Sequence, residues 1–120
     1  MNEHIVVLKT LADPTRLKVL KLILAEELCV CELQELLQIS QPAVSQHIAK
    51  LKTAGLVAER RAGMWTYYRG DRNRLQTALA DFSAFLDAEP SDTPAMADEV
   101  RRRATLNRVQ LCCDKGACEA

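Results

Sequence analysis

The chain has 120 residues, and its 16 lysines and arginines balance its 16 aspartates and glutamates. This length predicts one main domain, and no apolar run approaches the roughly 20 residues that a membrane-spanning helix needs. Residues 1–4 contain no basic leader region, so we expect a cytoplasmic protein with no membrane partner. The cysteine count of five is odd, which argues against a disulfide framework.

Three helices are predicted before residue 40. The first covers about residues 3–12, and Asp13-Pro14 marks the start of a second that ends near Ala25, because Asp caps helices and proline fits the first turn. The third covers residues 30–38. The expected core positions of the second and third helices are Leu17, Leu20, Leu24, Val30, Leu33 and Leu37, with Val19 and Ile23 widening the stripe. Arg16, Lys18 and Lys21 are expected to lie off the core face.

The segment Ser40–Ala54 predicts an amphipathic helix that begins at a serine cap. Val44, Ile48 and Leu51 form its apolar stripe. The opposite face carries small, amide, hydroxyl and lysine side chains and no acid. Such a face suits a DNA major groove, where Gln and Ser reach base edges and Lys reaches phosphates, although an ordinary solvated helix surface is the alternative.

A β-hairpin is predicted directly after this helix. Gly55 ends the helix, residues 56–61 form a short strand, Ala62-Gly63 makes the turn, and residues 65–69 return as a second strand. A helix-turn-helix pair followed by a hairpin is a winged helix-turn-helix, so the predicted fold is mostly α with a small hairpin. DNA binding is favoured over the solvated-surface alternative.

Charge is unevenly distributed along the chain. Residues 40–70 hold five basic residues against one acidic residue, whereas residues 71–100 hold two basic residues against seven acidic ones. The basic part coincides with the predicted DNA-binding elements, which supports that interpretation. The candidate base contacts are Gln41, Ser45 and Gln46, and the candidate phosphate contacts are Lys50, Arg60 and Arg61.

A helix from Asn73 to Ala88 is predicted after the hairpin. Its apolar stripe consists of Leu75, Ala78, Leu79, Phe82, Phe85 and Leu86. This is more apolar surface than a terminal helix of a small monomer should expose, so we expect a homodimer in which this helix and the first helix form the contact. We divide the chain into a DNA-binding and dimerisation domain at 1–88 and a linker, a helix over 95–111 and a cysteine-rich tail at 89–120.

The cysteines lie in Cys29-Val30-Cys31 and in Cys112, Cys113 and Cys118. Sulfur ligands without a nearby cluster of histidines or carboxylates select soft ions. The alternatives are small buried apolar residues for the first pair and incidental thiols for the tail. On an intact helix Cys29 and Cys31 diverge by about 200°, so one ion binding both would unwind the start of the third helix and disturb the link Ile39-Ser40.

Four separated segments together resemble the ArsR/SmtB family of metal-responsive repressors. They are Leu11–Leu17, Glu27–Leu33, Ser40–Ile48 and Gly55–Val57 with Tyr67–Arg69. The ELCVC element resembles the arsenic- and antimony-sensing branch. The resemblance implies a homodimeric repressor that binds an inverted-repeat operator and leaves it when As(III) or Sb(III) binds.

The sequence departs from that branch at Gln34, which stands where a third cysteine is common. The tail motif resembles a second kind of arsenic site, so we expect Cys29 and Cys31 to be required and a tail cysteine to supply the third thiolate. The family's zinc site, on the helix after the hairpin, is not expected because that helix contains no histidine. His47 is expected to pack or form a hydrogen bond within the DNA-binding part instead of binding metal, and no prosthetic group is expected.

An enzyme is not expected, because the sequence has no glycine-rich phosphate loop and no histidine base placed beside a cysteine nucleophile. Two alternative functions stay open. One is a thiol-based redox or sulfide sensor on the same scaffold, and the other is an arsenic-binding protein that does not bind DNA.

Overall fold

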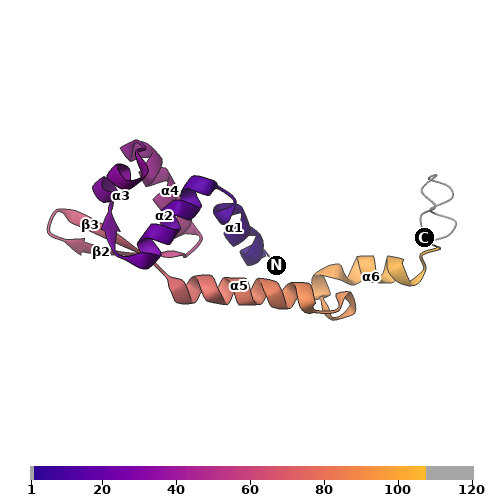
Figure 1. Ribbon diagram of the computed structural model, residues 1–120. Helices are drawn as coiled ribbons and strands as arrows, with labels where there is room; N and C mark the ends of the chain where they lie inside the picture. Colours follow the sequence, from indigo (N-terminus) through magenta and orange to yellow (C-terminus); the bar gives the residue numbers. More distant parts are fainter. Residues whose placement is uncertain (1, 108–120) are drawn as a thin grey trace. The chain divides into compact units, whose positions relative to one another are not determined.

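The computed structural model describes residues 2–107, which form helices and a small antiparallel sheet (Figure 1). The elements are α1 (Asn2–Leu11), α2 (Pro14–Ala25), β1 (Leu28–Cys29), α3 (Val30–Leu37), α4 (Gln41–Thr53), β2 (Val57–Ala62), β3 (Trp65–Gly70), α5 (Arg72–Asp87), the 3₁₀ turns η1 (Pro90–Asp92) and η2 (Pro94–Met96), and α6 (Ala97–Ala104). They divide into two compact units, Met1–Ser83 and the residues from Ala84 onwards. Within residues 2–107, no helix has the length and apolarity to cross a bilayer.

The two predicted helix starts are confirmed by their capping bonds. An Oδ1 atom of Asp13 accepts the backbone N–H of Arg16 at 2.9 Å, and this bond lowers the pKa of the Asp13 carboxyl. Ser40 Oγ accepts the N–H of Ala43 at 3.3 Å. Each side chain satisfies a donor that the first turn of a helix cannot satisfy itself. The mostly helical winged fold expected from the sequence is present.

The sheet has three strands in the order β1-β3-β2, whereas the sequence predicted two. β1 has only two residues, and it pairs Leu28 with Tyr68 and Cys29 with Tyr67. The predicted turn was wrong by one residue, because Ala62 pairs with Trp65 and the turn consists of Gly63 and Met64. The β2–β3 hairpin, called the wing below, projects from the helices in Figure 1.

The core lies in the first unit, between α2, α3, α4 and the base of the sheet. Its fully buried members include Val19, Ile23, Leu33, Val44, Leu51 and Leu56. Val44, Ile48 and Leu51 are buried as the stripe of α4 predicted. This packing fixes the rotation of α4, and it leaves the opposite face of that helix at the surface.

The predicted inner face of α2 was wrong at two positions. Leu17 is 47% exposed, and Arg16 is buried with 7% exposure. The Arg16 Nη1 group donates a hydrogen bond of 2.8 Å to the carbonyl of Thr10, the last-but-one residue of α1. The position of α1 therefore moves the buried side of α2 toward Arg16, which the periodicity of α2 alone did not reveal.

Helix α5 keeps much of its apolar stripe at the surface. Leu79 in the first unit is 45% exposed, and Leu86 in the second unit is 62% exposed. In the first unit, Ile5 and Val6 of α1 are also 44% and 47% exposed. These apolar side chains are the surface that the sequence assigned to a second subunit.

The region after α5 differs from its prediction. The 3₁₀ turn η1 lies in the predicted linker, η2 covers the expected start of the last helix, and α6 covers Ala97–Ala104, whereas the predicted helix began at residue 95 and continued beyond the described residues. All side chains from Arg101 to Asn107 are exposed. Only Val100 of α6 is half-buried, so little packing supports a longer helix. The predicted tail cysteines, Cys112, Cys113 and Cys118, lie outside the described residues.

Candidate DNA-binding surface and cysteine site

The exposed face of α4 carries the side chains predicted to contact bases. Gln41 and Gln46 are exposed, and Ser45 is half-buried. Gln41 Nε2 donates to Ser45 Oγ at 2.9 Å, so these two side chains already orient each other. Lys50 extends the same face toward the end of the helix. The surface combines amide and hydroxyl groups with a cation, which is the chemistry of base and phosphate contacts.

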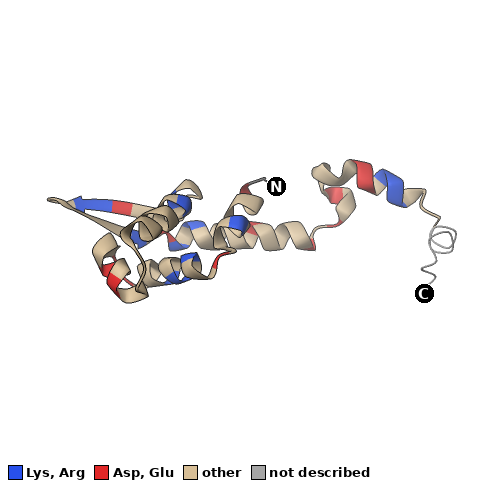
Figure 2. Ribbon diagram, turned by 90° about the horizontal axis from the view of Figure 1, so that it is seen from above, with Lys and Arg blue, Asp and Glu red and all other residues tan. Residues whose placement is uncertain are grey.

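The wing carries the other two predicted phosphate contacts, in different environments. Arg61 is exposed, and none of the ion pairs found among residues 2–107 involves it. Arg60 is held by Glu27, with Nη2 at 2.7 Å and Nε at 3.0 Å from one carboxylate oxygen. This contact lowers the pKa of Glu27 and raises the pKa of Arg60. Figure 2 shows an acidic segment next to a basic one on the wing.

Another ion pair joins the wing to α4. Lys52 Nζ, near the end of α4, contacts a carboxylate oxygen of Glu59 on β2. The contact raises the pKa of Lys52. Both partners are exposed, so this pair adds little stability, and it lies where the wing adjoins the end of the candidate recognition helix.

The first two cysteines lie where the sheet meets α3. Cys29 is the last residue of β1 and precedes α3, and it is buried, whereas Cys31 is exposed in the first turn. The N–H of Cys29 donates to Glu32 Oε1 at 3.0 Å, and this bond lowers the pKa of the Glu32 carboxyl. The premise that both cysteines lie on one helix was therefore wrong, since Cys29 belongs to a strand.

A row of neighbouring side chains joins Cys29 to the wing. Cys29 lies opposite Tyr67 in the β1–β3 pair, and Tyr67 lies opposite Arg60 in the β2–β3 pair. Directly opposed residues share one face of a sheet. The guanidinium of Arg60 lies over the Tyr67 ring, 5.0 Å from its centroid. Glu27 and Tyr67 were not predicted as site residues, although a two-residue turn at Gly63-Met64 would have given the pairing of Arg60 with Tyr67.

The described residues supply two thiols to this site. No group of three or more His, Cys, Asp or Glu side chains that could hold a metal occurs among residues 2–107. Trivalent arsenic prefers three thiolates, so Cys29 and Cys31 fit part of such a site. The predicted third donors fall in the part of the chain that the structure does not describe.

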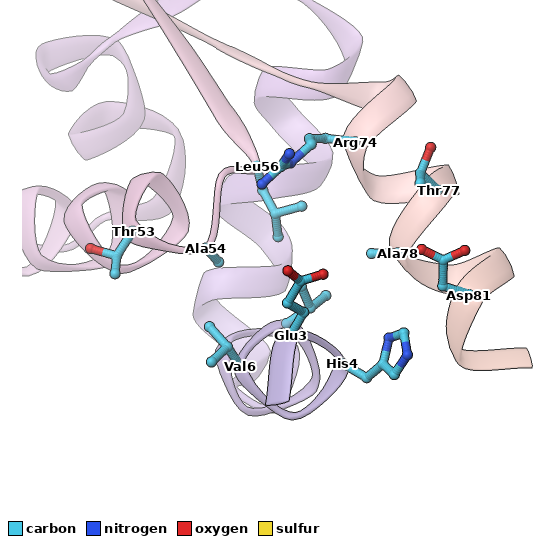
Figure 3. Close-up of a pocket in the computed structure, with 11 residues that line it drawn as sticks. Glu3, His4, Val6, Thr53, Ala54, Leu56, Arg74, Thr77, Ala78 and Asp81 are labelled. Atoms are coloured by element: carbon cyan, nitrogen blue, oxygen red, sulfur yellow. The ribbon is translucent and has the colours of Figure 1, made fainter. Parts of the chain in front are cut away.

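A hollow of about 330 Å³ lies between α1, the end of α4 and α5 (Figure 3). Glu3, Arg74 and Asp81 line it together with His4, whose ring is 6.3 Å from that of Phe82. The charges are mixed, and their side chains enter from different elements. These residues are not part of any three-ligand group of His, Cys, Asp or Glu found within residues 2–107.

A capped helix-turn-helix pair, an exposed polar face on its second helix and an adjoining basic wing define a winged helix-turn-helix DNA-binding protein. The family model of the bacterial regulatory proteins of the arsR family matches residues 13–59, from α2 into β2. The chain belongs to this family. Membership of a family of regulatory proteins supports the prediction that the chain is not an enzyme.

Individual relatives agree with this assignment. The arsenic resistance transcriptional regulator ArsR1 of Pseudomonas putida is 52% identical over 65 residues, which are 53% of this chain and 51% of that protein. A solved structure described as a possible transcriptional regulator for arsenical resistance is 31% identical, with a TM-score of 0.58, 78% of this chain covered and 91% of that one.

A third relative bears on assembly. The homodimeric winged helix-turn-helix DNA-binding domain of a possible ArsR-family regulator from Mycobacterium bovis is 28% identical, with a TM-score of 0.59, 73% of this chain covered and 83% of that one. This chain spans about half the length of the curated relatives it matches first.

Proposed function

We propose that the chain is the repressor of an arsenic-resistance operon, which binds an inverted-repeat operator as a homodimer and leaves it when As(III) or Sb(III) binds. The observation that carries the proposal is the position of Cys29, which ends a strand of the wing sheet and precedes the helix leading into α4. The names of relatives at about 50% identity support arsenic as the effector. Such a repressor acts in the cytoplasm, where its DNA is.

The proposed DNA contacts are those of α4 and the wing. Gln41, Ser45 and Gln46 read base edges, while Lys50 and Arg61 contact phosphates. Arg60 is held by Glu27 in this structure, so its contact with phosphate requires that ion pair to open or to share the guanidinium. A two-fold dimer places two copies of α4 about one helical turn apart on the operator.

The proposed dimer contact uses α5 and α1. The first unit exposes Leu79 of α5 and Ile5 and Val6 of α1, each between 44% and 47%. Burying large apolar side chains against a second copy removes them from water, which stabilises the assembly. The homodimeric relative supports this arrangement.

The proposed effector site consists of Cys29, Cys31 and one thiolate from Cys112, Cys113 or Cys118. Cys29 is buried and Cys31 is exposed, so one ion binding both must draw Cys29 out of its place in β1. That displacement breaks the hydrogen bond from the Cys29 N–H to the Glu32 carboxylate, which stabilises the first turn of α3. It also removes Cys29 from its position opposite Tyr67 in the wing sheet.

Release therefore follows two routes in this proposal. One runs through α3 and the link Ile39-Ser40 to α4, as the sequence suggested. The other runs through Tyr67 and Arg60 to the wing. A coupling of only a few kcal/mol between the two ligands suffices for an effective switch.

The test is a fluorescence anisotropy titration of labelled DNA from upstream of the regulated operon. Arsenite, methylarsenite, cadmium, zinc and peroxide are titrated in parallel against the complex. Arsenite should weaken binding at least tenfold, and the change Cys29→Ser with Cys31→Ser should keep DNA binding and lose this response. If that double variant still releases while Cys112→Ser does not, the tail is the sensor and both routes above are wrong.

The wing route has its own matched pair of variants. Glu27→Gln should make arsenite weaken operator binding by a smaller factor, because it removes the ion pair between Arg60 and the residue that precedes the strand of Cys29. Glu59→Gln also removes one negative charge that pairs with a basic side chain, but it breaks the pair with Lys52 instead. Equal ratios in the two variants would leave only the route through α3.

A further inference from the structure

A second hollow, of about 390 Å³, lies between α1, α2 and α4. Each of these helices contributes one cation to it: Lys9 from α1, Arg16 from α2 and Lys50 from α4. Thr10 and Thr53 also line it, with their hydroxyls donating to helix carbonyls, and no acidic residue lines it. Three cations that converge from three helices without an acid among them make a local site for an anion.

Arg16 is the unusual member of this group. Its side chain is 7% exposed, its Nη1 donates to the carbonyl of Thr10, and its Nε is buried without a hydrogen-bond partner. The ion pairs found within residues 2–107 do not include Lys9, Arg16 or Lys50. Asp13 is a nearby acid, but its carboxylate already caps α2 by accepting the backbone N–H of Arg16.

A buried guanidinium is normally paired with an anion or fully hydrogen-bonded, because leaving a donor unpaired away from water is costly. The open donor and the convergent lysines together indicate that an anion completes this hollow. A phosphate suits it, since its oxygens can accept hydrogen bonds from several donors in different directions.

The position of the hollow indicates where this phosphate comes from. Ala49, Lys50 and Thr53 line the hollow and are exposed on α4. They follow Gln46 at intervals of three and four residues, so they continue the face that carries the proposed base contact. DNA lying on that face brings its backbone to the mouth of the hollow.

We propose that Lys9, Arg16 and Lys50 form a binding site for one backbone phosphate of the DNA. The inference rests on the DNA binding proposed above, and it adds α1 and α2 to the DNA-contacting elements. Lys9 and Arg16 are thus DNA contacts beyond those the sequence indicated. The contact is independent of base sequence and fixes the depth of α4 in the groove.

The first experiment observes the Arg16 Nε–H directly by NMR in the full chain, with Arg16→Lys used to assign its resonance. Inorganic phosphate and an operator duplex are added in separate titrations. Both should shift the Arg16 resonance, because each supplies a phosphate oxygen to the open donor. A resonance that does not move in either titration overturns the proposal.

The second experiment measures operator and random-sequence DNA affinities at several salt concentrations. Lys9→Gln should weaken both DNAs equally and lower the slope of log affinity against log salt by about one, as expected for one lost phosphate contact. Lys18→Gln is the matched control, because Lys18 is exposed and lies about 200° around α2 from Arg16. It should leave the slope unchanged.

The outcomes separate this inference from the proposed function. If phosphate shifts Arg16 while Lys9→Gln keeps the wild-type slope, the hollow takes a free anion and the DNA contact is refuted. If the wild-type chain binds no DNA, the proposed function fails, whereas the phosphate titration still shows whether the hollow binds an anion. Unchanged circular dichroism confirms that each variant is folded.

Discussion

Replacing Gly70 with alanine should strain the junction between the wing and α2. Gly70 is buried at the end of β3, and a Cβ atom there would lie 2.6 Å from Leu24 Cδ2 and 2.7 Å from Leu24 Cγ. Carbon atoms pack best at about 3.5–4.0 Å, so each overlap is close to 1 Å. The Leu24 backbone nitrogen would lie 3.2 Å away, so a side-chain rotation alone does not make room.

We expect Gly70→Ala to lower the free energy of unfolding by roughly 1–3 kcal/mol, the usual effect of overpacking. Urea denaturation at fixed protein concentration measures it, because a dimer makes stability depend on concentration. In a Leu24→Ala background the same change should cost at least about 1 kcal/mol less, since the clashing Cγ and Cδ2 atoms are gone.

Gly63→Ala provides the control. Nothing lies within 4 Å of a Cβ atom at Gly63, so its cost arises only from the positive φ of 63° and is about 1–2 kcal/mol. That cost should add to the cost of Leu24→Ala. If Gly70→Ala is also additive with Leu24→Ala within about 0.5 kcal/mol, the contact with Leu24 does not govern this junction and the reasoning is refuted.

Three further predictions concern the core, the dimer and the cap of α2. Leu33→Ala removes a fully buried side chain and should lower the free energy of unfolding by about 2–5 kcal/mol in urea denaturation. Leu79→Glu should give a monomer with no operator binding, and a dimer in sedimentation velocity would place the interface elsewhere. The pKa of Asp13 is lowered in the folded protein, so its ionised carboxylate stabilises the fold above pH 3.8. This contribution is lost as the pH falls and the carboxylate takes up a proton. Asp13→Asn keeps the helix cap and should make the free energy of unfolding fall less steeply at acidic pH. An unchanged pH dependence of stability would contradict this role.

The sequence predicted the elements that local chemistry determines. Asp13-Pro14 and Ser40 placed two helix starts because capping depends on neighbouring residues only. The stripe of α4 gave its buried face for the same reason. The strand β1 was missed because two residues carry no periodic pattern, and its pairing with Tyr67 and Tyr68 joins segments far apart in the chain.

The candidate site could be predicted only in part. The exposed face of α4 followed from its apolar stripe, whereas the roles of Gln46, Lys50 and Arg61 in DNA binding remain predictions. The pairing of Arg60 with Glu27 spans 33 residues and depends on the fold. The burial of Arg16 likewise depends on where α1 ends, since the Thr10 carbonyl is its acceptor.

The wing sheet also carries an intrinsic fluorescent probe. Trp65 is the only tryptophan of the chain, and its side chain is half exposed on β3. It lies on the same sheet face as Tyr67, two residues away, and Tyr67 is opposite Cys29. Indole emission depends on the polarity around the ring, so Trp65 is expected to report a rearrangement of this sheet on ion or DNA binding. If the proposed function holds, stopped-flow mixing of unlabelled protein should time the binding of the ion against the release of the DNA.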